Sequence, residues 1–90
     1  MDAAVKKEFQ QLLEMLQELV EDRSVPRNIR STVEEAMQKI NVKKPGVEDF
    51  STAVYLLDDI SKDINMPSHT RTDIWEIISK IEAIKEKIKE

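Results

Sequence analysis

Two stretches of the chain decide its fold. They read Glu21-Asp22-Arg23-Ser24-Val25-Pro26-Arg27-Asn28-Ile29-Arg30 and Lys62-Asp63-Ile64-Asn65-Met66-Pro67-Ser68-His69-Thr70-Arg71. In each stretch an Asp is followed four residues later by a Pro, and four residues after that by an Arg. Proline cannot continue a helix but suits the first turn of a new one. Each stretch therefore predicts a turn between two helices.

Apolar residues on both sides of the first turn recur at helical spacing. They predict one helix from about Asp2 to Asp22 and a second that ends near Asn41. The segment from Asn41 to Gly46 holds the only glycine of the chain and is interpreted as a loop. The core positions expected from these two helices are Val5, Phe9, Leu12, Leu13, Leu16, Leu19, Val20, Ile29, Val33, Ala36, Met37 and Ile40.

The second half of the chain has the same organisation. A third helix follows the loop and starts with Glu48 and Asp49, acidic residues that suit a helix N-terminus. A fourth helix follows Pro67, and its end is rich in lysine, which suits the negative end of the helix dipole. The expected core positions are Phe50, Ala53, Val54, Leu57, Ile60, Ile74, Ile77, Ile78, Ile81, Ile84 and Ile88, with Ile64 as a further candidate.

The chain overlays itself when it is shifted by 41 residues. Phe9 then falls on Phe50, and the Asp, Pro and Arg of the two turns coincide. We therefore expect one all-α domain, residues 1–90, that contains a helical hairpin twice, in residues 1–41 and 47–90. Two hairpins favour an up-and-down four-helix bundle. The alternative is an open, HEAT-like pair of hairpins completed by a partner subunit.

The charged residues of both turns lie at helix ends where the helix dipole disfavours their charge. Asp22 and Asp63 follow helix C-termini, while Arg30 and Arg71 lie near helix N-termini. The structural interpretation is that Asp22 pairs with Arg30, and Asp63 with Arg71, so that a bidentate ion pair fixes the angle of each hairpin.

The same turns support a functional interpretation. In an up-and-down bundle both turns lie at one end, where helix N-termini offer free N–H groups to an anion. The candidate binding residues are Arg23, Arg27, Arg30, His69 and Arg71. Further donors are Asn28, Ser31, Thr32, Thr70 and Thr72. A phosphate, an acidic partner or an RNA backbone could bind there, although neighbouring carboxylates oppose this.

Composition argues against catalysis. The chain has no cysteine and a single histidine, His69, so neither a thiolate nor a paired-imidazole metal site is expected. Nothing in the sequence provides a Gly-rich phosphate loop or an activated nucleophile. We therefore expect no enzyme activity, no metal and no cofactor.

The charge pattern and the hydropathy restrict partners and compartment. The net charge is −4, which does not suit a surface that binds nucleic acid along its whole length. No apolar run approaches the ~20 residues of a membrane span. The start of the chain has no signal-peptide pattern, so the cytoplasm is the expected compartment.

Four apolar residues allow two interpretations. Tyr55 and Trp75 stand beside the main stripes and could line the edge of the core or anchor a contact. Met15 and Leu56 occupy equivalent repeat positions and could form a second patch or belong to the core. We expect a small interaction or scaffolding protein with an unknown protein partner, with a homodimer as a further option.

The two turns also resemble a known family. The run Asn65-Met66-Pro67-Ser68-His69-Thr70-Arg71-Thr72-Asp73-Ile74-Trp75 is similar to a family of small archaeal proteins catalogued as an uncharacterised protein family, UPF number 0147. The resemblance extends over nearly the whole chain and is loosest in the first helix. It implies a helical bundle in an archaeal cytoplasm, and it brings no activity, substrate or site residues.

Overall fold

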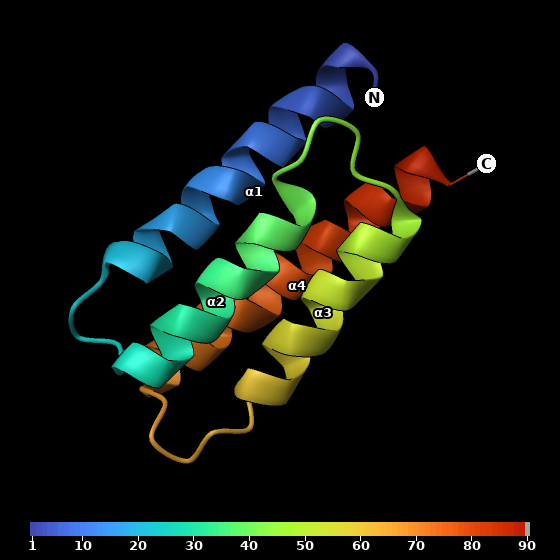
Figure 1. Ribbon diagram of the computed structural model, residues 1–90. Helices are drawn as coiled ribbons and strands as arrows, with labels where there is room; N and C mark the ends of the chain where they lie inside the picture. The colour runs from blue at the N-terminus through green and yellow to red at the C-terminus, as the bar shows by residue number, and fades with distance from the viewer. Residues whose placement is uncertain (90) are drawn as a thin grey trace.

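The computed structural model describes residues 1–89, and in that part of the chain all regular structure is helical. The four helices are α1 (Ala3–Glu21), α2 (Arg27–Ile40), α3 (Val47–Ile60) and α4 (Ser68–Ile88). They run alternately up and down (Figure 1). The predicted helices and turns are confirmed, with boundaries shifted by a few residues at most.

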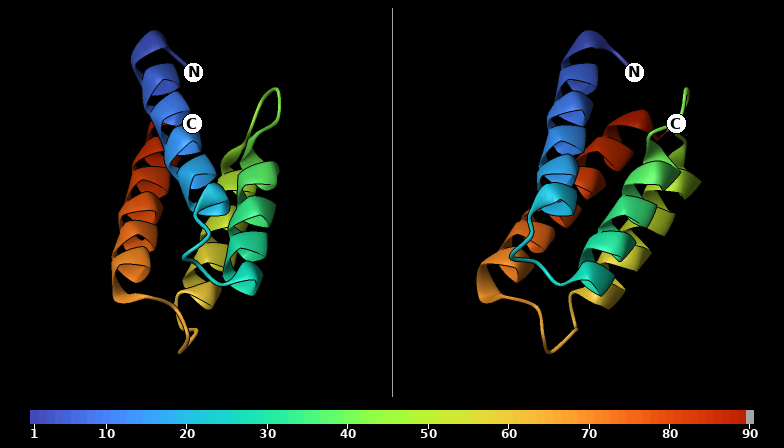
Figure 2. Two further views of the ribbon diagram at one scale, coloured as in Figure 1. Left: turned by 90° about the vertical axis from the view of Figure 1, so that its left-hand side faces the viewer. Right: turned by 60° about the vertical axis from the view of Figure 1, so that its left-hand side comes forward.

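The helices close into a bundle of 38 × 20 × 19 Å. Each helix packs against two others: α1 and α3 both contact α2 and α4. Figure 2 shows α1 and α4 on one side and α2 and α3 on the other. The contact between α1 and α4 distinguishes this arrangement from an open, HEAT-like pair. Each hairpin covers the apolar face of the other, so the closed four-helix bundle is confirmed and the open alternative is not.

One continuous core joins all four helices, and it contains most of the predicted positions. Phe9 and Phe50, which occupy equivalent places in the repeat, meet edge to face with ring centroids 5.8 Å apart. The aromatic pair therefore joins the two hairpins at equivalent positions of the sequence repeat. Half-buried positions at the edge of the core are Leu13, Val20, Met37, Val54, Ile60, Ile78 and Ile88.

Three residues beside the turns differ from the sequence-based expectation. Ile64, a core candidate, is 92% exposed, because α3 ends at Ile60 and Ile64 lies in the turn. Val25 and Met66, which precede the two prolines, are buried instead. Each turn therefore inserts one apolar side chain into the bundle and closes its end.

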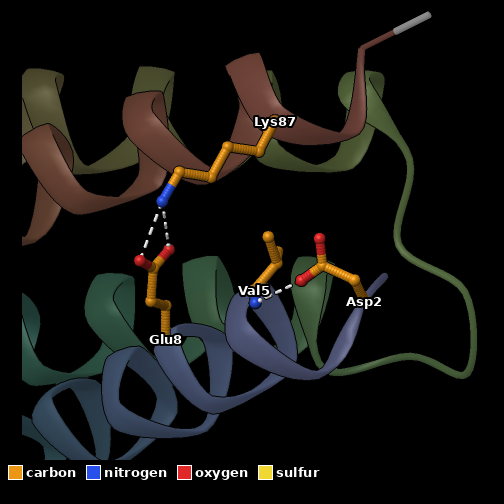
Figure 3. A network of polar contacts seen from close by, with 4 residues as sticks. All are labelled: Asp2, Val5, Glu8 and Lys87. Atoms are coloured by element: carbon orange, nitrogen blue, oxygen red, sulfur yellow. Dashed lines mark hydrogen bonds and ion pairs between the residues drawn. The ribbon is translucent and has the colours of Figure 1, made fainter.

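Polar contacts fix the opposite end of the bundle (Figure 3). The Asp2 carboxylate accepts a hydrogen bond from the Val5 N–H at 2.9 Å and caps α1. Lys87 near the end of α4 contacts both carboxylate oxygens of Glu8, at 2.8 and 2.9 Å. The Lys87–Glu8 contact attaches the second turn of α1 to the last turn of α4.

The two Pro-containing turns lie at one end of the bundle, away from the chain ends and from the α2–α3 loop (Figure 1). This is the arrangement that the sequence predicts. Within residues 1–89, no helix combines the length and the apolar character that crossing a membrane requires.

Candidate functional site

The carboxylates of the two turns bind the backbone of their own turns. Asp22 Oδ1 accepts hydrogen bonds from the Ser24 N–H at 2.9 Å and from the Ser24 hydroxyl at 2.7 Å. At the equivalent position, Asp63 Oδ1 accepts a hydrogen bond from the Asn65 N–H at 2.8 Å. Each Asp therefore closes a local turn with its side chain, a role that explains why Asp follows both helices.

These contacts lower the pKa of Asp22. The largest cause is the hydrogen bond from the Ser24 hydroxyl, followed by the bond from the Ser24 N–H; the charges of His69 and Arg30 add to it. Hydrogen bonds to a carboxylate stabilise its charged form. The turn therefore favours the ionised form of Asp22 over its protonated form.

The arginines of the turns bind backbone carbonyl groups. Arg71 donates from Nε to the Ser61 carbonyl and from Nη2 to the Asp63 carbonyl, both at 2.8 Å. Arg30 donates from Nε to the Val25 carbonyl at 3.0 Å.

The structure therefore corrects the predicted turn pairs. Within residues 1–89, Asp22 makes no ion pair with Arg30, and Asp63 makes none with Arg71. The physical reason is the antiparallel path of the chain: Arg71 lies at the start of α4 but reaches the end of α3, where carbonyl groups lack helical partners. Asp and Arg stabilise the same turn through different backbone groups.

The five residues predicted to bind an anion do not form one free cluster. Arg30 and Arg71 are half-buried and already donate to the turns. Arg23, Arg27 and His69 are exposed. A hollow of about 240 Å³ beside Arg27 and Arg30 is also lined by Val20, Ser31 and Glu34. The Glu34 carboxylate opposes an anion in that hollow.

Thr70, predicted as a donor to an anion, is fully buried, and its hydroxyl has no hydrogen-bond partner within residues 1–89. It occupies the repeat position of Ile29, which is also fully buried. Thr70 therefore belongs to the core and is removed from the candidate binding residues.

The two turns are joined to each other. Asn28 Nδ2 donates to Asp63 Oδ2 at 3.0 Å, from the first turn to the second. The repeat positions equivalent to Asn28 and Asp63 are His69 and Asp22, and the charge of His69 contributes to the lowered pKa of Asp22. The contact between Asn28 and Asp63 was not predicted from the sequence.

The two exposed aromatic residues lie elsewhere, on the second hairpin. Tyr55 is 71% exposed and Trp75 is 55% exposed, so neither lines the edge of the core. Their counterparts in the first hairpin are Glu14 and Glu34, also exposed. The second hairpin thus has aromatic surface where the first has carboxylates. Met15 and Leu56, by contrast, are half-buried and pack against the core.

Tyr55 and Trp75 belong to the same side of the second hairpin. Lys85 of α4 reaches Ser51 of α3 at 3.4 Å, which marks the sides on which these helices meet. Tyr55 follows Ser51 by four residues, so helical periodicity brings it to the marked side of α3. Trp75 follows Arg71 by four residues, and Arg71 donates to the Ser61 carbonyl at the end of α3, so Trp75 lies towards the α3 side of α4. Half-buried Val54 and Ile78 share these sides, and the four apolar residues form what we call the α3–α4 face: Val54, Tyr55, Trp75 and Ile78.

Charged side chains around the α3–α4 face pair with one another. Lys62 contacts Asp58 at 3.7 Å, and Lys85 contacts Glu82 at 3.3 Å. Polar, charged side chains therefore lie on the same hairpin as the aromatic residues. An apolar centre with a polar rim is the usual anatomy of a protein interface.

Comparisons with known proteins agree with this fold. The family model described as Uncharacterised protein family (UPF0147) matches residues 1–84. A UPF0147 protein of Methanocaldococcus jannaschii is 49% identical over 74 residues, which cover 79% of this chain and 77% of the relative. A UPF0147 protein of Archaeoglobus fulgidus is 36% identical over 84 residues, covering 93% of this chain and 97% of the relative.

Two solved structures share the architecture. The crystal structure of a protein of unknown function, MMP1188, matches with a TM-score of 0.79 and 42% identity, covering 91% of this chain and 92% of that one. A UPF0147 protein of Thermoplasma acidophilum matches with a TM-score of 0.81 and 32% identity, covering 88% of this chain and 94% of that one. On this evidence the chain belongs to the archaeal family UPF0147, which is uncharacterised.

Proposed function

We propose that this chain is a non-enzymatic interaction module of the cytoplasm and that it binds a protein partner through the α3–α4 face. The observation that carries the proposal is the exposure of Tyr55 and Trp75 on one side of the second hairpin. Tyr and Trp are enriched among the residues that dominate binding energy at interfaces.

The internal repeat strengthens this argument. Glu14 and Glu34 show that the same two surface positions can carry carboxylates without harm to the bundle. The fold therefore does not require aromatic side chains at residues 55 and 75. Large apolar side chains left in water without a folding role are better explained by a surface that is covered in a complex.

A photocrosslinking experiment tests the proposal. A benzophenone amino acid replaces Tyr55 in the full chain, produced in its native host cells, and the covalent products are identified by mass spectrometry. The matched control has the same amino acid at Glu14, the equivalent position of the first hairpin. We expect one dominant product, with a partner protein or with a second copy, from position 55 only.

A substitution of Trp75 tests whether the crosslinked product depends on the α3–α4 face. Trp75→Glu, which installs the residue of the first hairpin, should remove the dominant product and leave the circular dichroism spectrum unchanged. Equal products from positions 55 and 14, or a product that survives Trp75→Glu, would contradict the proposal.

A second candidate function is binding of phosphate or an RNA backbone at the end that contains the turns. It is favoured by Arg23 and Arg27, which are exposed and form no ion pair within residues 1–89. Such binding should weaken steeply as salt rises. Titration of single-stranded RNA at two salt concentrations, with Arg23→Gln/Arg27→Gln as the variant, tests it. An affinity for RNA that changes neither with the salt concentration nor in the double variant would exclude this second function.

A further inference from the structure

A second surface feature lies at the opposite end of the bundle from the turns. It is a hollow of about 540 Å³ between the N-terminal half of α1, the α2–α3 loop and the end of α4. Its volume falls within the range of small-molecule sites, about 300–1,000 Å³. Its lining residues are Met1, Lys6, Phe9, Gln10, Leu13, Asn41, Val42, Lys43, Lys44, Pro45 and Ile88.

The lining combines apolar and cationic side chains. Phe9, Leu13 and Ile88 are buried or half-buried and supply apolar walls from α1 and α4. Lys6 approaches from α1, while Lys43 and Lys44 come from the loop. Segments from both ends of the chain and from its middle therefore meet around one hollow.

The charge of this hollow is opposite to that of the whole protein. The chain has a net charge of −4, yet no Asp or Glu of residues 1–89 is among the lining residues. Within residues 1–89, Lys6, Lys43 and Lys44 form no ion pair, whereas Lys62, Lys85 and Lys87 each contact a carboxylate. Three lysines without an ion pair in the described part of the chain thus line a hollow that has apolar walls.

We propose that this hollow binds a small amphiphilic anion, a molecule with an apolar body and a terminal carboxylate. The body would contact Phe9, Leu13 and Ile88, and the carboxylate would lie among the ammonium groups of Lys6, Lys43 and Lys44. Burial of the body supplies affinity in proportion to the apolar area covered. Opposite charge at the rim selects the anion over a neutral molecule of the same length.

Titration of the full chain with octanoate, followed by amide chemical shifts in NMR, tests the proposal. We expect saturable shifts at the residues of the hollow and little change at Tyr55 and Trp75. Octanol has the body without the charge and acetate has the charge without the body, so both should bind at least roughly tenfold more weakly.

Matched variants separate a specific site from general charge. Lys43→Gln/Lys44→Gln should weaken octanoate binding roughly tenfold, which corresponds to a loss of about 1.4 kcal/mol from removing two cations near the carboxylate. Lys62→Gln/Lys80→Gln removes the same charge from exposed positions outside the hollow and should leave the affinity within about twofold.

Three results would overturn the proposal. They are equal binding of octanoate and octanol, shifts that spread along the whole bundle, and equal loss of affinity in both double variants. Binding to vesicles of anionic lipid without binding of free octanoate would assign the lysines to a membrane surface instead. None of these results bears on the α3–α4 face, because its residues lie outside the hollow.

Discussion

Asn28 at the start of α2 donates a hydrogen bond to the carboxylate of Asp63 in the turn between α3 and α4, with a distance of 3.0 Å between Nδ2 and Oδ2. The same carboxylate accepts the Asn65 N–H through its other oxygen. One side chain therefore both shapes its own turn and joins the two hairpins. The sequence predicted an ion pair between the Asp63 carboxylate and Arg71, but the carboxylate binds Asn28 instead.

This relationship predicts which residues are energetically coupled. Asn28→Ala and Asp63→Ala should each destabilise the bundle, Asp63→Ala by more, because it removes two hydrogen bonds of about 1 kcal/mol each at most. In a double-mutant cycle measured by urea unfolding, the Asn28/Asp63 coupling should exceed the Asp63/Arg71 coupling, since Arg71 binds the backbone of Asp63 and not its side chain. The reverse order would show that the carboxylate and the guanidinium interact after all.

The hydrogen bonds of the arginines predict that replacing Arg by Lys lowers the free energy of unfolding by different amounts at different positions. Arg71→Lys should cost about 1–2 kcal/mol of unfolding free energy, because a single ammonium cannot reproduce two directed bonds to the Ser61 and Asp63 carbonyls. Arg30→Lys should cost less, since Arg30 makes one such bond. Arg23→Lys is the matched control and should have almost no effect. Equal losses at all three positions in thermal unfolding would contradict the assignment.

The buried hydroxyl of Thr70 predicts a stabilising substitution. Thr70→Val keeps the shape of the side chain and removes an oxygen that has no partner within residues 1–89, so it should raise the free energy of unfolding by about 1 kcal/mol. The control is Thr72→Val, at an exposed position where the hydroxyl donates to the Ser68 carbonyl at 3.2 Å. That change should bring no gain. A loss of stability in Thr70→Val would indicate that the hydroxyl is satisfied in solution.

The lowered pKa of Asp22 predicts a dependence of stability on pH. Its ordinary value is 3.8, and the folded value lies below it. A carboxyl whose pKa is depressed by folding stabilises the protein above its unfolded pKa, and this contribution disappears as the pH falls through the folded pKa. Ser24→Ala removes the leading cause, so it should raise the pKa of Asp22 towards 3.8 in a carboxyl NMR titration. An unchanged pKa would refute the role of the Ser24 hydroxyl.

The sequence predicted the fold from features that depend on periodicity and on the backbone. The repeat that aligns Phe9 with Phe50 indicated two equivalent hairpins, and these two rings meet in the core. The proline positions predicted both turns. Periodicity alone also made Ile64 a candidate for the core, because it could not show that α3 ends before that residue.

The candidate sites were harder to predict, because a sequence does not show which atom a polar side chain binds. The spacing of Asp63 and Arg71 suggested an ion pair, whereas backbone N–H and carbonyl groups are the partners in the structure. Thr70 looked like a surface donor because its type is polar, although its repeat counterpart Ile29 indicated burial. The exposure of Trp75 was one of two options, and the Glu at the equivalent position was the signal that favoured it.

The edge-to-face contact of Phe9 with Phe50 constrains how the two halves of the chain can diverge. A side chain that touches its own counterpart cannot change size unless the counterpart adjusts, because the interior is close-packed. Glu34 and Trp75 are repeat counterparts on the surface, where a change in the size of one side chain requires no adjustment of the other. A change at Phe9 or Phe50 should therefore be tolerated best when the other ring changes in a compensating way.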